Sequence, residues 1–192
     1  MNIGLSTAAF YGRWETEEAA EHLSDYGAAC AEVFLQTRGE MTAAFAAEVR
    51  QKLNGIPCTS MHPKGTLFEN ELFGRSPRQR EEGWDFFQHA LDAAAELGAS
   101  YYVYHGWHSS AGNKIPFDAQ RNADVVGEMQ LKAAQRGIQI AWENVSWCQL
   151  TTPERVIEIK KRLPDIRFTL DIKQAMRVGR DPAEFISAMG RQ

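Results

Sequence analysis

Cysteine is scarce in this chain, and its spacing matches no disulfide or metal-binding pattern. The three cysteines, Cys30, Cys58 and Cys148, lie far apart, and none belongs to a CxxC pair. A disulfide framework or a zinc knuckle requires closely and regularly spaced cysteines, so neither is indicated. We expect three buried, reduced thiols.

Long apolar runs and dense basic segments are also missing. Residues 1–14 have no basic stretch ahead of a long apolar run, and no segment approaches bilayer-spanning length. We therefore expect no membrane partner and a cytoplasmic location. The net charge is -4. Sequence-independent nucleic-acid binding needs a dense face of Lys and Arg, so only a local basic groove would allow it here.

What the chain does contain is one unit repeated six times: a short apolar run, a loop and an amphipathic stretch. The apolar runs predict strands at residues 2–6, 31–35, 57–61, 100–104, 138–145 and 166–171. The amphipathic stretches predict helices at residues 16–26, 42–54, 76–97, 117–136, 152–163 and 181–190. With 44% hydrophobic residues, we expect residues 1–192 to form a single domain with one core.

Six βα units without hairpin signals predict an α/β fold, in which helices cover a parallel sheet. An open doubly wound sheet and a (β/α)8 barrel are the two candidates. The sequence has no GxGxxG in its first loop and no GxxxxGK[ST], and polar residues end several different strands, which favours the barrel. A closed barrel typically has eight strands and about 250 residues. We therefore expect an incomplete TIM-type barrel, truncated at the C-terminus; the alternative is a complete open sheet.

Two of the predicted strands end in an acidic residue. Glu143 ends the fifth apolar run, and Asp171 ends the sixth. Successive parallel strands end at the same edge of a sheet, where two carboxylates repel each other unless they share a proton or a cation. We interpret Glu143 and Asp171 as a candidate pair of metal ligands. The alternative is that each caps its strand in solvent.

Six short segments together carry a family resemblance. They are NIGLS at residues 2–6, AEVFL at 31–35, TSMHP at 59–63, YVYHG at 102–106, IAWENV at 140–145 and FTLDIKQA at 168–175. In this order and at these intervals, over the whole length, the chain resembles the xylose isomerase-like TIM barrels. This superfamily includes sugar phosphate isomerases and epimerases and endonuclease IV.

The resemblance implies a divalent metal ion, Mn, Mg, Co or Zn, held by Glu143 and Asp171. It also implies a histidine from strand seven and a glutamate from strand eight, neither of which this sequence contains. Two carboxylates are few ligands for a divalent ion, so we expect metal binding by this chain to be weak or absent. His62 and His105 are implied to face the same cavity as substrate contacts or, in the endonuclease branch, as further ligands.

Other candidate residues have both a functional and a structural interpretation. Many family members read D-x-x-H after strand six, where this chain has Gln174; this weakens the multi-zinc endonuclease interpretation, although an amide can bind a sugar hydroxyl. Lys173 could meet a phosphate or an enediolate oxygen, or be a solvated surface charge. Trp107 could stack on a sugar or pack the rim. Glu32, inside an apolar strand, is either a structural ion-pair partner or a member of the site.

Three functional hypotheses follow from these observations. The first is a metal-dependent isomerase or epimerase of a carbohydrate substrate, in which Glu143 moves a proton through an enediolate. The second is an endonuclease IV-like phosphodiesterase, which would need more histidine ligands and a more basic surface. The third is an inactive barrel fragment that forms a homo-oligomer through its open edges.

Overall fold

The computed structural model describes residues 3–108 and 117–191, and its centre is one sheet of six parallel strands. The strands are β1 (Gly4–Ser6), β2 (Cys30–Leu35), β3 (Cys58–Pro63), β4 (Tyr101–Tyr104), β5 (Gln139–Glu143) and β6 (Arg167–Thr169). Each strand pairs in parallel with its neighbour in sequence, giving the order β1-β2-β3-β4-β5-β6. This sequential order confirms the predicted α/β fold of the incomplete barrel type, because a doubly wound sheet reverses its strand order.

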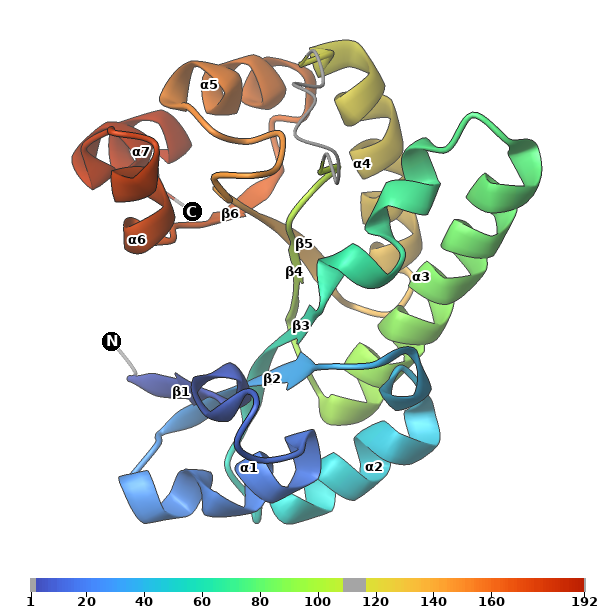
Figure 1. Ribbon diagram of the computed structural model, residues 1–192, viewed down its shortest axis with the longest axis vertical. Helices are drawn as coiled ribbons and strands as arrows, with labels where there is room; N and C mark the ends of the chain where they lie inside the picture. Colours follow the sequence, from blue (N-terminus) through green and yellow to red (C-terminus); the bar gives the residue numbers. More distant parts are fainter. Residues whose placement is uncertain (1–2, 109–116, 192) are drawn as a thin grey trace.

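The helices lie outside the curved sheet. They are α1 (Thr16–His22), α2 (Ala43–Lys52), α3 (Pro77–Leu97), α4 (Ala119–Ala134), α5 (Pro153–Arg162), α6 (Ile172–Arg177) and α7 (Pro182–Met189). Figure 1 shows α1 to α5 around the outer side of the strands, with β1 and β6 at the two ends of the arc. Within the described residues, these two strands have no pairing partner on their outer edges.

The expected starts and ends of the helices are largely observed. The Thr152 side chain caps α5 by accepting a hydrogen bond from the backbone N–H of Arg155, and Asp181 forms a capping box at the start of α7. At the end of α3, Gly98 adopts a left-handed φ of 74°, and its N–H bonds to carbonyls of the last turn. Proline after a cap and glycine after the last turn therefore define these boundaries, as predicted.

Two segments predicted as loops contain helical structure. The loop after β3 folds into the 3-10 segments η4 (Gly65–Leu67) and η5 (Glu69–Phe73). The chain beyond β6 turns at once into the short helix α6. Three further 3-10 segments are η1 (Thr7–Phe10), η2 (Leu23–Tyr26) and η3 (Arg38–Glu40). Asn2, in the first predicted strand, and residues 109–116, in the predicted loop after β4, lie outside the described residues.

The core lies between the outer face of the sheet and the helices. Its largest fully buried side chains include Trp142, Tyr102, Tyr104, Phe87 and Phe185. The three cysteines are buried free thiols, as predicted. In the part of the chain that the structure describes, no helix combines the length and the apolar character needed to cross a membrane.

Candidate metal and substrate site

Side chains on the strands alternate between the core and the concave inner face of the sheet. Because Trp142 and Tyr104 point into the core, their neighbours Glu143 and His105 point inward. His62, one residue before the end of β3, also faces inward. The carboxyl ends of three neighbouring parallel strands therefore bring two imidazoles and one carboxylate to the same edge of the sheet.

The three side chains converge closely enough to hold one ion. His62 Nε2 lies 2.7 Å from His105 Nε2, and Glu143 Oε2 lies 3.2 Å from His105 Nε2 and 3.8 Å from His62 Nε2. Ligand atoms that surround a zinc-type ion at about 2.0–2.2 Å in a tetrahedral arrangement lie roughly 3.3–3.6 Å apart. The observed distances lie on both sides of this value. The donor set of two imidazoles and one carboxylate is one that Zn, Mn and Co accept.

The groups around the cluster do not neutralise the negative charge and the lone pairs that meet within it. His62 Nδ1 lies 3.4 Å from Glu32 Oε1, and His105 Nδ1 lies 4.0 Å from Glu69 Oε2, so each outer ring nitrogen faces a carboxylate. If both outer nitrogens carry hydrogen, the two inner lone pairs and the Glu143 carboxylate face one another. Among the described residues, Glu143 Oε2 is buried with no hydrogen-bond partner. A shared proton or a bound cation would neutralise this arrangement.

Two of the carboxylates stay ionised in spite of their burial. Burial raises the pKa of Glu143, but the imidazoles of His105 and His62 more than offset this, and the pKa lies below its ordinary value. Burial also raises the pKa of Glu32, but His62 and the hydrogen bonds from Ser6 and Ser60 lower it by more, so that the net change is again a decrease. Both shifts favour the ionised carboxylates, which are the form that binds a cation.

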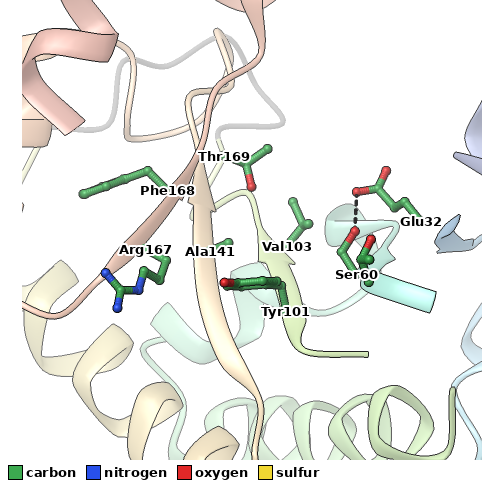
Figure 2. A pocket seen from close by; sticks show the side chains of 9 residues that line it. Glu32, Ser60, Tyr101, Val103, Ala141, Arg167, Phe168 and Thr169 are labelled. Atoms are coloured by element: carbon green, nitrogen blue, oxygen red, sulfur yellow. Dashed lines mark hydrogen bonds between the residues drawn. The ribbon is translucent and has the colours of Figure 1, made fainter. Parts of the chain in front are cut away.

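Glu32 connects the cluster to the interior of the barrel. Ser6 Oγ and Ser60 Oγ donate hydrogen bonds of 2.8 and 3.1 Å to its two carboxylate oxygens. Figure 2 shows Glu32 and Ser60 on one wall of a cavity of about 350 Å³ along the concave face. The other lining residues are Thr59, Tyr101, Val103, Ala141, Arg167, Phe168 and Thr169. Glu32 therefore both holds His62 and lines the cavity. It is at once the ion-pair partner and the site neighbour that the sequence left as alternatives.

Asp171 lies outside the cluster of converging ligand atoms. Its Oδ1 accepts a hydrogen bond of 2.9 Å from the backbone N–H of Gln174 and caps α6. Its backbone is held by the Asn144 side chain, which accepts from Asp171 N at 2.7 Å and donates to Asp171 O at 2.9 Å. The pairing of Glu143 and Asp171 as metal ligands stays a prediction. The expectation of weak binding counted these two carboxylates alone, whereas the structure adds two imidazoles to Glu143.

The other predicted contact residues have structural neighbours. Trp107 stacks on Phe73 with ring centroids 5.5 Å apart, and the Arg121 guanidinium lies 5.2 Å from the Trp107 ring. Lys173 is exposed on α6, whereas Gln174 is buried and its Oε1 accepts a hydrogen bond from Ser146 N. None of these contacts tests substrate binding, so all three residues stay predicted contacts.

Two further residues lie near the cluster: Trp147, whose ring the sequence offers as a sugar-stacking or rim-packing residue, and Glu69, which the sequence did not single out. Trp147 is half-exposed, with its ring centroid 5.7 Å from that of His105. Glu69, on η5, is fully buried, and burial raises its pKa to about 7. The signal for Glu69 in the sequence is weak: it is an acid inside TLFENELF, a segment with apolar residues on both sides.

Strands in sequential parallel order, with candidate ligands at their carboxyl ends, define a (β/α)-barrel protein with a possible metal site. The family model of the xylose isomerase-like TIM barrel matches residues 20–192, so the chain belongs to this family. This confirms the family resemblance inferred from the six sequence segments.

Solved structures support the same fold. A D-psicose 3-epimerase, solved in the presence of D-fructose, is 16% identical with a TM-score of 0.80, over 99% of this chain and 70% of that one. A D-tagatose 3-epimerase-like protein is 19% identical with a TM-score of 0.77, over 98% and 71%. The IOLI protein with a bound zinc atom is 18% identical with a TM-score of 0.76, over 96% and 67%. No curated protein sequence matches the chain.

Proposed function

We propose that this chain is a metal-dependent isomerase or epimerase of a sugar or sugar phosphate. The observation that carries the proposal is the convergence of His62 Nε2, His105 Nε2 and Glu143 Oε2 at one edge of the sheet. The substrate class is supported by the names of two similar structures, a D-psicose 3-epimerase and a D-tagatose 3-epimerase-like protein. The zinc atom of the IOLI protein supports a metal ion.

The roles of the residues follow from their charge and position. A divalent ion held by His62, His105 and Glu143, with Asp171 as a further candidate ligand, would polarise adjacent substrate oxygens. Glu143 is ionised and buried, so its carboxylate is suited to take a proton from a carbon beside a carbonyl and return it through an enediolate. Trp107, Lys173 and Gln174 are proposed contacts to the carbohydrate.

A second candidate function is a metal phosphodiesterase of the endonuclease IV type. The observation that favours it is that the imidazoles of His62 and His105 face the same point as Glu143, which the family resemblance associates with that branch. Against it are the net charge of -4 and Gln174 in place of a histidine. We therefore rank it below the isomerase.

Metal titration and an activity screen test the proposal. The wild-type chain, His62→Asn and Glu143→Gln would be titrated calorimetrically with Zn²⁺, Mn²⁺ and Co²⁺, with Glu128→Gln as the control. Glu128 is an acid on α4 that pairs with Lys132 at the surface. The metal-loaded protein would then be screened on ketoses, their phosphates and a DNA phosphodiester. Conversion of a sugar that is lost in Glu143→Gln supports the isomerase. Cleavage of DNA alone supports the phosphodiesterase, and a chain that binds no metal contradicts both.

A further inference from the structure

We propose that Glu69 is a positioning residue of the site, which holds His105 with hydrogen on Nδ1 and the lone pair of Nε2 directed at the metal cluster. This inference rests on the proposed function in naming a metal ion as the ligand of His105. The orientation of the ring, however, is a property of the metal-free chain and is testable there.

Two buried polar groups that face each other carry the inference. Within the described part of the chain, Glu69 Oε1 and His105 Nδ1 are both buried without a hydrogen-bond partner. Glu69 Oε2 lies 4.0 Å from His105 Nδ1 and accepts a hydrogen bond of 3.3 Å from Gly106 N. A buried donor or acceptor left unpaired destabilises the folded state. Closing the gap by about 1 Å would give the pair normal hydrogen-bond geometry.

The backbone at Gly65 keeps this approach open. A Cβ at this position would lie 2.5 Å from both Glu69 Oε2 and His105 Nδ1, closer than any real side chain could be accommodated. The glycine is therefore needed for space beside the pair. The residue that starts η4 leaves room for a carboxylate from η5 to reach the imidazole.

The same arrangement occurs at the other histidine. Glu32, on β2, faces His62 Nδ1, as Glu69 on η5 faces His105 Nδ1. A metal-binding histidine commonly donates its second N–H to a carboxylate, which sets the tautomer and raises the basicity of the ligating nitrogen. Two unrelated elements thus supply the same kind of partner to the two imidazoles.

The backbone of His105 is held separately, so Glu69 is left to control the ring. Trp142 Nε1 donates a hydrogen bond of 3.2 Å to His105 O from the core side. On the site side, within the described ranges, His105 Nε2 contacts the groups that share the cluster, His62 and Glu143. The Nδ1 side faces Glu69, which is the carboxylate placed to choose the tautomer.

The test compares Glu69→Leu with Glu69→Gln, because the amide oxygen of Gln still accepts a hydrogen bond and Leu does not. Glu71→Gln is the matched control: Glu71 lies on the same segment, η5, and pairs with Arg38. Histidine ¹⁵N spectra of the metal-free proteins report whether His105 Nδ1 carries hydrogen. Calorimetry with Zn²⁺ reports the affinity.

We expect Glu69→Leu to lose the Nδ1–H signal of His105 and to weaken Zn²⁺ binding by about 10–100-fold. Glu69→Gln and Glu71→Gln should both keep the signal and stay within a few-fold of wild type. If Glu69→Leu fails to fold, Gly65→Ala tests the same contact with Glu69 present, and should also lose the signal. A wild-type His105 spectrum in a folded Glu69→Leu or Gly65→Ala variant would overturn the proposal, even if zinc binding changed. A wild-type chain that binds no zinc would instead remove the proposed function, and the spectra would still decide the role of Glu69.

Discussion

The burial of Glu69 predicts an unusual pH dependence of stability in the metal-free chain. Burial raises the pKa of Glu69 from 4.5 to about 7. At pH values below the unfolded pKa of about 4.5, the carboxyl is protonated in both the folded and the unfolded state, so its burial carries no cost from ionisation. As the pH rises from about 4.5 through about 7, the unfolded chain ionises first, so unfolding releases a proton and the folded state loses stability. At about 1.4 kcal/mol for each pH unit between the two values, the total loss is about 3 kcal/mol.

Glu69→Gln isolates this effect, because Gln is neutral at every pH and can still accept the hydrogen bond from Gly106 N. We expect the free energy of unfolding of the wild type, relative to that of Glu69→Gln, to fall by about 3 kcal/mol between pH 4.5 and pH 8. Urea denaturation at intervals across this range, with EDTA present, would measure it. Groups that do not interact with Glu69 titrate alike in both proteins, so their contributions cancel in the comparison; His105 and Glu143 interact with Glu69, and their coupling to it is part of the measured difference. Parallel stability curves for the two proteins would refute the reasoning.

Three further predictions concern the site and the surface. Glu143→Gln should lower kcat/KM by at least about 100-fold in a sugar isomerisation assay, with Glu128→Gln at wild-type level. Asn144→Ala should cost about 1–2 kcal/mol in urea denaturation, because it leaves the N–H of Asp171 unpaired while its C=O keeps the hydrogen bond from Ala175 N–H; a cost under about 0.5 kcal/mol would contradict this. We also predict a homo-oligomer that survives high salt, since apolar side chains are exposed near the ends of the sheet; a stable 21.6 kDa monomer in light scattering would contradict it. The exposed side chains are Ile3, Ile172, Met176 and Ile186.

The sequence by itself determined the order of the elements and the class of the fold. The sequence has apolar runs at regular intervals, proline at helix starts and glycine at helix ends. These signals act through local backbone preferences, which do not depend on the surrounding structure. For the same reason, Glu143, His62 and His105 could be placed at strand ends before any contact was known. Because the strands are parallel, their carboxyl ends all lie at the same end of the sheet, and these residues must lie there too.

The convergence of the side chains was decided by the tertiary structure, because it depends on register. Glu143 pairs with Thr169, so Asp171 lies two residues beyond the end of the paired strand, where the chain has already turned into α6. Its carboxylate therefore caps a helix, a role that spacing alone does not distinguish from metal binding. Glu69 comes from a loop whose path is set by the packing of η5 against α3 and η4. Local sequence rules describe how a segment folds but do not say which distant side chain it meets. For that reason, the contact between Glu69 and His105 was found only in the tertiary structure.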